Sequence, residues 1–386
     1  MPSRRTSKIP LRLSSCFLSV VFVSGILLLV ILNLNLAIAV TASQVVNFSP
    51  KKLAVAVAVS QGLKNKPDWH DAFLVFAHAA KKAISTSIHS IELLAIMPES
   101  LSNEDRQTFV EMGFVVVAKP PFVPLDEVQN TFGRSEMQKG CCGEAENLKI
   151  YAAELVQYDF VLVVDGDIMM LRSFDELLDV DTKIRLLGTY DYELDTARSA
   201  FPPINGGWLL FRPNLTDFHA LRALIREGDF RPGSGWKGSR TGWAYGGAGP
   251  QGLLSFYFNQ VVPGQPQFNT TTPQRGDGDV TGRKFTRQPE SSRFLNLDRA
   301  VYDVMAMPTL VASLNSSNES FERVQSFHFA GNCLKPWACQ ETKSAICERA
   351  TAQWFLLRTE VATMLGVKAP ERCLPGGRYK SLLQVR

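Results

Sequence analysis

The chain has 386 residues, of which 45% are hydrophobic and 20% are charged. This composition supports a large buried core and excludes an intrinsically disordered protein. The formal net charge is +4, and the chain has four basic residues before its first apolar run: Arg4, Arg5, Lys8 and Arg12. The remainder is therefore neutral (4 − 4 = 0), which argues against sequence-independent binding to nucleic acid.

A long apolar segment follows this basic tail, and residues 16–32 contain no charged side chain. A membrane-spanning helix needs about 20 apolar residues, and flanking basic residues stay on the cytoplasmic side. We therefore expect a cytoplasmic tail over residues 1–15, a signal-anchor transmembrane helix over 16–40, a short stem over 41–51 and one folded domain over 52–386. This predicts a single-pass type II protein of the Golgi or ER membrane, with its domain in the lumen.

A cleaved secretory signal is the alternative for the apolar segment. Ala37-Ile38-Ala39 and Val40-Thr41-Ala42 provide small residues at possible cleavage positions. Both alternatives place the domain in the secretory lumen. Glycosylation sequons agree with that compartment, and they occur at Asn47, Asn214, Asn269, Asn315 and Asn318.

The cysteines also fit an oxidising compartment. Cys16 falls in the apolar segment, and an even number follows it: Cys141, Cys142, Cys333, Cys339, Cys347 and Cys373. These cysteines permit three disulfides, whose pairing the sequence does not decide. A zinc site is the alternative, but no Cys-x-x-Cys spacing supports it.

Predicted strands and helices alternate along the domain. In chain order we expect a strand over residues 53–60, a helix over 68–86, a strand over 90–97, a helix over 103–112, a strand over 114–118, a helix over 145–157, strands over 158–164, 184–189 and 208–211, and a closing helix over 352–365. The alternation predicts an α/β fold, with a mostly parallel sheet and helices on both faces. Ligands of such sheets bind at the carboxyl ends of the strands, where the strand order reverses.

Three segments between these elements lack periodicity. Residues 119–143 are rich in Pro and Gly and are expected to form a loop. Residues 230–250 are rich in Gly, and we expect them to form a mobile lid. The polar stretch over residues 263–293 is expected to be an exposed insertion.

An acidic triplet, Asp165-Gly166-Asp167, follows the wholly apolar residues 160–164. Alternate residues of an extended chain point the same way, so both carboxylates can face one point. Hard divalent ions such as Mn²⁺ and Mg²⁺ take oxygen ligands and keep positions open for phosphate. An isolated triplet of this kind commonly marks a solvated turn, but its position directly after a buried strand favours a metal site.

Further motifs accompany the triplet in a fixed order: Asn147-Leu-Lys149, residues 171–177, Asn205-Gly206-Gly207, residues 250–254 and residues 328–337. Over residues 52–340 the set resembles the family 8 glycosyltransferases, which are retaining, glycogenin-like enzymes. With its predicted anchor, the chain resembles a membrane-anchored member of this family. The resemblance is specific because several motifs recur in sequence order. It implies a GT-A-type fold, in which a mostly parallel twisted sheet flanked by helices forms a Rossmann-like nucleotide-binding half.

The resemblance also implies a metal site. Asp165, Asp167 and His328 match the family's ligands for Mn²⁺, with Mg²⁺ as the alternative ion. Gly331 would let backbone N–H groups approach the donor diphosphate, and Lys335 would bring a positive charge to it. The alternative for His328 is a histidine satisfied at the end of a strand.

Donor-binding residues are implied in the same way. Lys149 matches a lysine that faces the phosphates, although an ordinary surface lysine is the alternative. The other implied donor-binding positions are Gly166, Asn205, Gly206 and Gly207. The last three match family residues that border the donor sugar, and a simple turn is the alternative for them. The floor of the nucleoside pocket is expected near Val59 and Ser60. This segment departs from the family pattern, which has Thr and a downstream Tyr.

The catalytic residues show a second departure. The family commonly reads Asp-Gln-Gly where this chain reads Pro250-Gln251-Gly252, and no acid occurs between residues 230 and 256. A carboxylate nucleophile is therefore missing at its usual place. We expect front-face transfer, with the Gln251 amide oxygen stabilising positive charge at the anomeric carbon. Asp191 resembles a family aspartate near the sugar, and a surface turn acid is its alternative.

The sequence therefore predicts a metal-dependent hexosyltransferase that retains configuration. It would move a sugar from a UDP-sugar to a glycan, glycolipid or glycoprotein acceptor. A catalytically inactive lumenal protein that binds glycans or nucleotide sugars is the alternative, because the acid at Pro250 is missing. A nicotinamide oxidoreductase is disfavoured, since no Gly-x-Gly-x-x-Gly follows the first predicted strand.

Overall fold

The computed structural model describes residues 49–139, 143–191, 201–242, 247–262, 273–274, 285–286, 292–306, 321–342, 344–370, 372–374 and 377–384. Lys51–Arg386 forms one compact unit. The predicted anchor lies outside the described residues, as do Cys141, Cys142 and every sequon except Asn214. Among the helices of the described residues, none combines the length and the apolar character needed to cross a bilayer.

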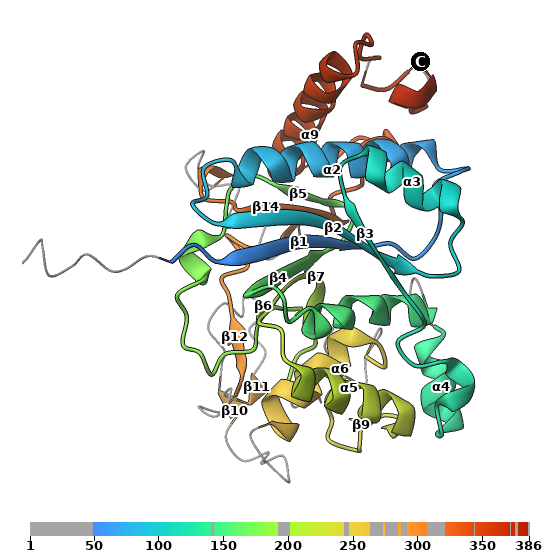
Figure 1. Cartoon of the computed structure of the whole chain (residues 1–386), viewed down its shortest axis with the longest axis vertical. Helices are drawn as coiled ribbons and strands as arrows, with labels where there is room; N and C mark the ends of the chain where they lie inside the picture. The colour runs from blue at the N-terminus through green and yellow to red at the C-terminus, as the bar shows by residue number, and fades with distance from the viewer. Residues whose placement is uncertain are drawn as a thin grey trace, which may run out of the picture. The chain divides into compact units, whose positions relative to one another are not determined.

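A seven-stranded sheet forms the centre of the fold (Figure 1). Its strands, in spatial order, are β12 (Phe294–Asn296), β6 (Leu186–Tyr190), β7 (Ile204–Phe211), β4 (Phe160–Val164), β1 (Lys52–Ala58), β2 (Ser90–Pro98) and β3 (Val115–Lys119). Neighbouring strands run parallel except at β7, which is antiparallel to both β4 and β6. The predicted α/β fold with a mostly parallel sheet is confirmed.

The strands of this sheet are apolar on both sides because helices cover both faces. In β1, Leu53, Val55 and Val57 face one core cluster, whereas Ala54 and Ala56 face the other. Figure 1 shows α2 (Pro67–Ile84) and α3 (Asn103–Glu111) on one face. On the other face lie the 3-10 helix η2 (Gly143–Glu154), α5 (Leu215–Glu227), α6 (Pro250–Phe256) and the π-helix η5 (Tyr257–Val261).

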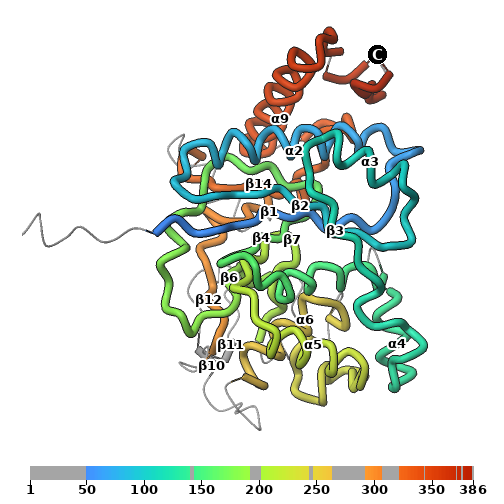
Figure 2. Tube along the Cα trace, viewed as in Figure 1, coloured from blue at the N-terminus to red at the C-terminus, as the bar shows by residue number. Residues whose placement is uncertain are grey.

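Helix α2 is buried on two sides. Phe73, Phe76, Ala77 and Ala80 pack against the main sheet, as the helical spacing predicts. The opposite side, which includes Val75, packs into a separate cluster with α9 (Ala345–Met364) and a second sheet. The trace in Figure 2 shows α9 beyond α2, away from the main sheet.

The second sheet has three strands, in the order β13 (Val304–Ala306), β14 (Ser326–Gly331) and β5 (Ile168–Met170). β14 runs antiparallel to β5, with His328 opposite Ile168. The chain leaves the main sheet at the end of β4, passes through the acidic triplet and enters β5. The triplet therefore joins the two sheets.

Several helices of the structure were not predicted. The segment over 119–143 contains two helices, η1 (Leu125–Glu127) and α4 (Thr131–Met137). Helix α5 was not predicted, although its end signals are present in the sequence. The Asn214 side chain caps it by accepting from the Asp217 N–H at 3.0 Å, and Gly228 ends it with φ +64°. Short polar caps of this kind are easily read as loops.

The predicted lid over 230–250 also contains regular structure. β8 (Phe230–Arg231) pairs antiparallel with β9 (Gly235–Trp236). The buried Trp236 donates its indole N–H to the Gly247 carbonyl at 2.9 Å, which anchors the described part of the segment. Mobility stays a prediction. In the predicted insertion over 263–293, β10 (Pro273–Gln274) pairs with β11 (Phe285–Thr286), and residues 263–272, 275–284 and 287–291 lie outside the described residues.

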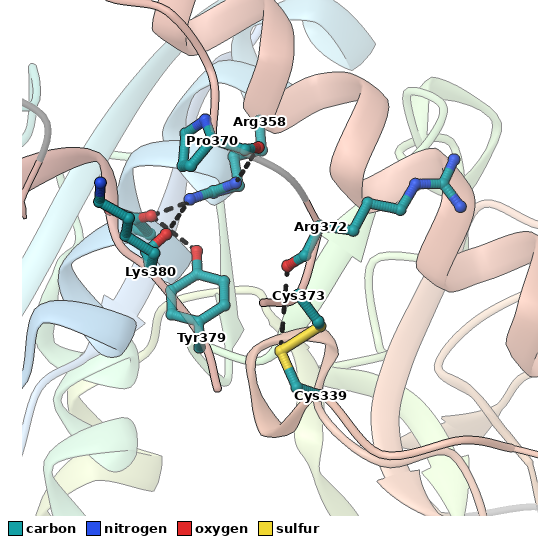
Figure 3. Close-up of a disulfide and its surroundings, with 8 residues drawn as sticks. Cys339, Arg358, Pro370, Arg372, Cys373, Tyr379 and Lys380 are labelled. Carbon is teal, nitrogen blue, oxygen red and sulfur yellow. Dashed lines mark hydrogen bonds and ion pairs between the residues drawn. A yellow bond between two sulfur atoms is a disulfide. The ribbon is translucent and has the colours of Figure 1, made fainter. Parts of the chain in front are cut away.

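Two disulfides hold the C-terminal part of the chain, Cys333–Cys347 and Cys339–Cys373. The second joins the 3-10 helix η6 (Pro336–Ala338) to the tail that leads to η7 (Leu382–Gln384). Figure 3 shows this disulfide near Arg358, whose guanidinium donates to the carbonyls of Pro370 and Lys380. The structure thus decides two pairings that the sequence left open.

One further 3-10 helix, η3 (Asp175–Leu177), follows β5.

Candidate active site

A cavity of about 530 Å³ opens at the carboxyl ends of β1 and β4. The chain proceeds from β1 to β2 and β3 on one side, whereas β4 lies on the other side of β1. The strand order therefore reverses at this point, where sheets of this class bind ligands. Every predicted site residue except Gly331 lines the cavity: Lys149, Asp165, Gly166, Asp167, Asp191, Asn205, Gly206, Gly207, Gln251, His328 and Lys335.

Asp165, Asp167 and His328 form a cluster whose ligand atoms lie within 4.8 Å of one another. The backbone holds both acids in place. Asp165 donates its N–H to the Gly207 carbonyl at 3.0 Å, and the Asp167 carbonyl accepts from the Phe329 N–H at 3.0 Å. The pairing of β14 with β5 then brings His328 Nε2 to 3.4 Å from Asp167 Oδ1.

Each carboxylate of the triplet is also paired with a lysine. Lys149 Nζ lies 2.6 Å from Asp165 Oδ1 and donates to the Gly206 carbonyl at 2.9 Å. Lys335 Nζ forms an ion pair with Asp167. The Lys149 side chain is only 10% exposed, so it is not an ordinary surface lysine. If a divalent cation bound the two carboxylates, the positive charges of Lys149 and Lys335 would be available to an anionic ligand.

Charge, more than burial, sets the protonation of this cluster. Burial by itself would raise the pKa of Asp167, but the neighbouring His328 and Lys335 outweigh it and lower that pKa. Burial would lower the pKa of His328, but the charges and hydrogen bonds of Asp167 and Asp303 raise it well above 6.5. The pKa of Lys149 is likewise raised, because Asp165 outweighs the burial. Asp167 is therefore held ionised, as a metal ligand must be.

The wall of the cavity next to the cluster carries polar groups suited to a sugar. Asn205 donates to Asp191 Oδ2 at 3.2 Å and to Met305 Sδ at 2.9 Å. Its Oδ1 accepts from the Gly207 N–H at 2.7 Å. Asn205 and Gly207 belong to β7 rather than to a turn, because β7 begins at Ile204. Gln251 lies in the first turn of α6 and completes this wall.

Two glycines of the cavity are required by close packing. A Cβ at Gly207 would lie 2.5 Å from His328 Nδ1, and one at Gly166 would lie 2.7 Å from Phe73. A Cβ at Gly206 would meet the Gln251 side chain at 3.2 Å. Gly331 does not line the cavity; it ends β14 with φ +65°. Its predicted contact with a diphosphate stays a prediction.

Sequence reasoning missed several residues of the site. Lys66 and Trp69, at the start of α2, line the cavity together with Met305 of β13. The order of elements could have indicated the first two, because the helix after the first strand begins beside the site. Asp303, which holds His328, lies in no recognisable motif, and only the tertiary structure reveals it.

The residues present fit a hard divalent cation. Two carboxylates and one imidazole are a donor set that suits Mn²⁺, and Mg²⁺ also takes carboxylate oxygens. Asp303 Oδ1 lies 3.0 Å from His328 Nδ1, so the other ring nitrogen, Nε2, faces Asp167. The arrangement matches the common pattern in which a metal-binding histidine is oriented by a carboxylate behind it.

No family model and no curated protein matches the chain. Several solved structures are distantly similar to it. A galactosyltransferase, LgtC, in complex with donor and acceptor sugar analogues, has 13% identity and a TM-score of 0.46, covering 83% of this chain and 98% of its own. Mouse xyloside xylosyltransferase 1 has 11% identity and a TM-score of 0.41, covering 74% and 98%. The glycosyltransferase GlyE of Streptococcus pneumoniae has 12% identity and a TM-score of 0.40, covering 83% and 66%. Likenesses this distant carry no conclusion about activity, so the function proposed next rests on the cavity.

Proposed function

We propose that this chain is a metal-dependent retaining hexosyltransferase, which moves a sugar from a UDP-sugar to a glycan, lipid or protein acceptor. The observation that carries this proposal is the cluster of Asp165, Asp167 and His328, whose ligand atoms lie within 4.8 Å. The cluster lies in a cavity of about 530 Å³ at the point where the strand order reverses. That volume is in the usual range for a bound small molecule.

The donor would lie across this cavity. Val59 and Ser60, which follow β1 and line the cavity, would form its nucleoside side. Lys149 and Lys335 carry the positive charges that a diphosphate requires, and both lie beside the triplet. The sugar would face Asn205 and Gln251, whose amide groups can donate to hydroxyl oxygens and accept from hydroxyl groups.

The chemistry proposed is front-face transfer. The acceptor hydroxyl attacks the anomeric carbon on the side from which the diphosphate departs. A carbon–oxygen bond to the acceptor forms, the bond to the diphosphate breaks, and the hydroxyl proton passes to the leaving phosphate oxygen. A bound Mn²⁺ would act as a Lewis acid for the departing UDP. The Gln251 amide oxygen would stabilise positive charge at the anomeric carbon, and Asp191 is the carboxylate on the same wall.

A binding protein without catalysis is the competing function, because Pro250 stands where an acid is expected. The complete Asp-Asp-His cluster and the two lysines argue against a protein that binds only glycans, which requires none of them, whereas a protein that binds nucleotide sugars would use them all. Measurement of UDP release separates the two. An enzyme should hydrolyse or transfer from at least one UDP-sugar with Mn²⁺ present, and a chelator should stop it. The absence of turnover with every UDP-sugar, despite Mn²⁺ binding, would favour the binding protein.

Two variants test the roles within the site. Asp167→Ala should lower turnover by at least about 100-fold, because it removes a metal ligand. Gln251→Ala should lower it by on the order of 100-fold. Asp181→Ala and Gln107→Ala are matched controls on exposed positions and should leave turnover unchanged. Full activity of Gln251→Ala, alongside loss in Asp167→Ala, would show that the role given to Gln251 is wrong.

The identity of the sugar can be tested by thermal shift. UDP-glucose, UDP-galactose, UDP-glucuronic acid and UDP-N-acetylglucosamine are the candidates, each measured with Mn²⁺. The preferred donor should raise the Tm most, because a ligand that binds only the folded state stabilises it by mass action.

We also propose that the domain lies in the secretory lumen, anchored in the Golgi or ER membrane by residues 16–40. The basic residues before this segment and the Asn-x-Ser/Thr sequons support the proposal. The two disulfides of the C-terminal part agree with an oxidising compartment. Protease digestion of sealed microsomes tests it. The domain should be protected, and digestion of the domain without detergent would contradict the proposal.

A further inference from the structure

Behind the metal cluster lies a buried carboxylate that belongs to none of the sequence motifs. We propose that Asp303 is a positioning residue: it holds the His328 ring by Nδ1, so that Nε2 is presented to the divalent cation. This role rests on the proposed function, since it assumes that the cluster binds a metal ion. Asp303 itself is not a ligand, because it does not line the cavity and the imidazole ring separates it from Asp165 and Asp167.

The geometry of the ring assigns a different partner to each nitrogen. His328 Nδ1 lies 3.0 Å from Asp303 Oδ1, and Nε2 lies 3.4 Å from Asp167 Oδ1. The side chains of His328 and Asp303 are 8% and 0% exposed, so water does not compete for these contacts. A histidine that binds a metal through Nε2 must carry its hydrogen on Nδ1. Asp303 is placed to accept that hydrogen.

Asp303 is in turn held by neighbouring strands. Its Oδ2 accepts from the Thr189 hydroxyl of β6 at 3.2 Å, and its N–H donates to the Ser326 hydroxyl of β14 at 3.1 Å. Its φ is +54°, an uncommon conformation for a residue with a side chain. Conformations of this kind persist where the surrounding structure enforces them, and they cluster at functional sites. The carboxylate is therefore fixed before any ligand binds.

The ring also packs closely against Gly207 of β7. A Cβ at that position would lie 2.5 Å from His328 Nδ1, so the ring occupies the space that a side chain would take. The ring is thus packed against β7 and held by Asp303, and it cannot turn to offer Nδ1 to the cavity without losing the Asp303 contact. A side chain held in this way is preorganised as a ligand.

Binding of Mn²⁺ alone, without nucleotide, tests the role of Asp303. The loss of the free-ion signal in electron paramagnetic resonance reports the affinity and requires no catalysis. Asp303→Ala removes the acceptor and should weaken Mn²⁺ binding by about 10- to 100-fold. Asp303→Asn keeps an oxygen that can accept from Nδ1, so it should restore most of the lost affinity. Asp298→Asn, an exposed position on the same segment, is the matched control and should bind as the wild type does.

The outcomes separate this proposal from the proposed function. Equal Mn²⁺ affinity in the wild type and Asp303→Ala would show that Asp303 has no positioning role, while the metal site stands. If neither the wild type nor any variant binds Mn²⁺, the metal-dependent function is wrong and the role of Asp303 is wrong with it. Thermal unfolding in chelator checks that the variants are folded. If Asp303→Ala does not fold, Thr189→Val decides, because it removes a hydrogen bond that holds Asp303 and leaves the carboxylate in place. It should weaken Mn²⁺ binding measurably, and wild-type affinity would overturn the proposal.

Discussion

His328 Nε2 lies 3.4 Å from Asp167 Oδ1, although the two residues belong to distant parts of the chain. They meet because β14 pairs with β5, the short strand that directly follows the acidic triplet, with His328 opposite Ile168. The metal cluster therefore depends on the small second sheet as much as on the large one. Changes that shift this pairing should affect metal binding before they affect the stability of the main sheet.

Gly207 is predicted to matter through the space it leaves for His328. Gly207→Ala should weaken Mn²⁺ binding by about 10- to 100-fold, since the added Cβ would lie 2.5 Å from Nδ1 and displace the ring. Gly206→Ala is the comparison, because its Cβ would meet the side chains of Gln251 at 3.2 Å and Lys149 at 3.4 Å, and its nearest neighbours do not include His328, so it should weaken binding less. Titration with Mn²⁺ compares the two. Equal affinities would contradict this account of Gly207.

The disulfides are predicted to hold the segment that carries Lys335. Cys333 precedes this lysine and Cys339 follows it, and each is joined to the C-terminal part. Replacing both Cys339 and Cys373 by Ser should lower stability by about 2–4 kcal/mol. It should also raise the KM for the donor about two- to tenfold, because ordering a loop on binding costs roughly 0.5–1.5 kcal/mol per side chain.

The control is the same double Cys-to-Ser replacement made in a Lys335→Met variant. If the disulfide acts through Lys335, its removal should change KM little once that lysine is gone, because the two changes are then not additive. Steady-state kinetics of the four proteins measures this. An equal rise in KM in both backgrounds would show that the disulfide acts on the site by another route.

The C-terminal tail is predicted to depend on one buried ion pair. Arg358 Nε lies 3.1 Å from Asp71 Oδ2, and their side chains are 1% and 0% exposed. Asp71 also accepts from the Tyr379 hydroxyl at 2.6 Å. Arg358→Met should lower the free energy of unfolding by about 3–5 kcal/mol, because it leaves a buried carboxylate without its cation. Urea unfolding measures the loss, and Arg349→Met on the exposed side of α9 is the control. Similar losses in both variants would contradict the prediction.

A pH-dependent contribution is predicted where α9 meets α2. Hydrogen bonds from Lys82 and His78 lower the pKa of Glu360 below its ordinary value of 4.5. A depressed carboxyl pKa stabilises the fold above the ordinary value, and that contribution is lost as the pH falls through the lowered pKa. Glu360→Gln should therefore cost about 0.2–1 kcal/mol at pH 7. The difference from the wild type should vanish in acid.

Thermal unfolding at a series of pH values checks this prediction, with the exposed Glu341→Gln as the control. A wild-type advantage that grows as the pH falls below 4.5 would mean that the sign is wrong.

Much of the main sheet and of the helices that cover it could be predicted from local patterns. The apolar runs of β1 and β4 need helices on both faces, and the alternation of elements implies a mostly parallel sheet. Helices α4 and α5 were missed because their signals are single capping residues, Asn130 and Asn214, which also fit loops. A helix was predicted over residues 145–157, and the spacing of apolar residues did not show that η2 is a 3-10 helix.

The sequence by itself determined the residue types of the site, because Asp165, Asp167 and His328 stand in motifs that can be read along the chain. It could not determine which partner each residue has. The burial of Lys149, the pairing of the cysteines and the contact of Asp303 with His328 depend on strands that are far apart in sequence. Their pairing is set by the packing of two sheets against α2, so only the tertiary structure decided how the site is held together.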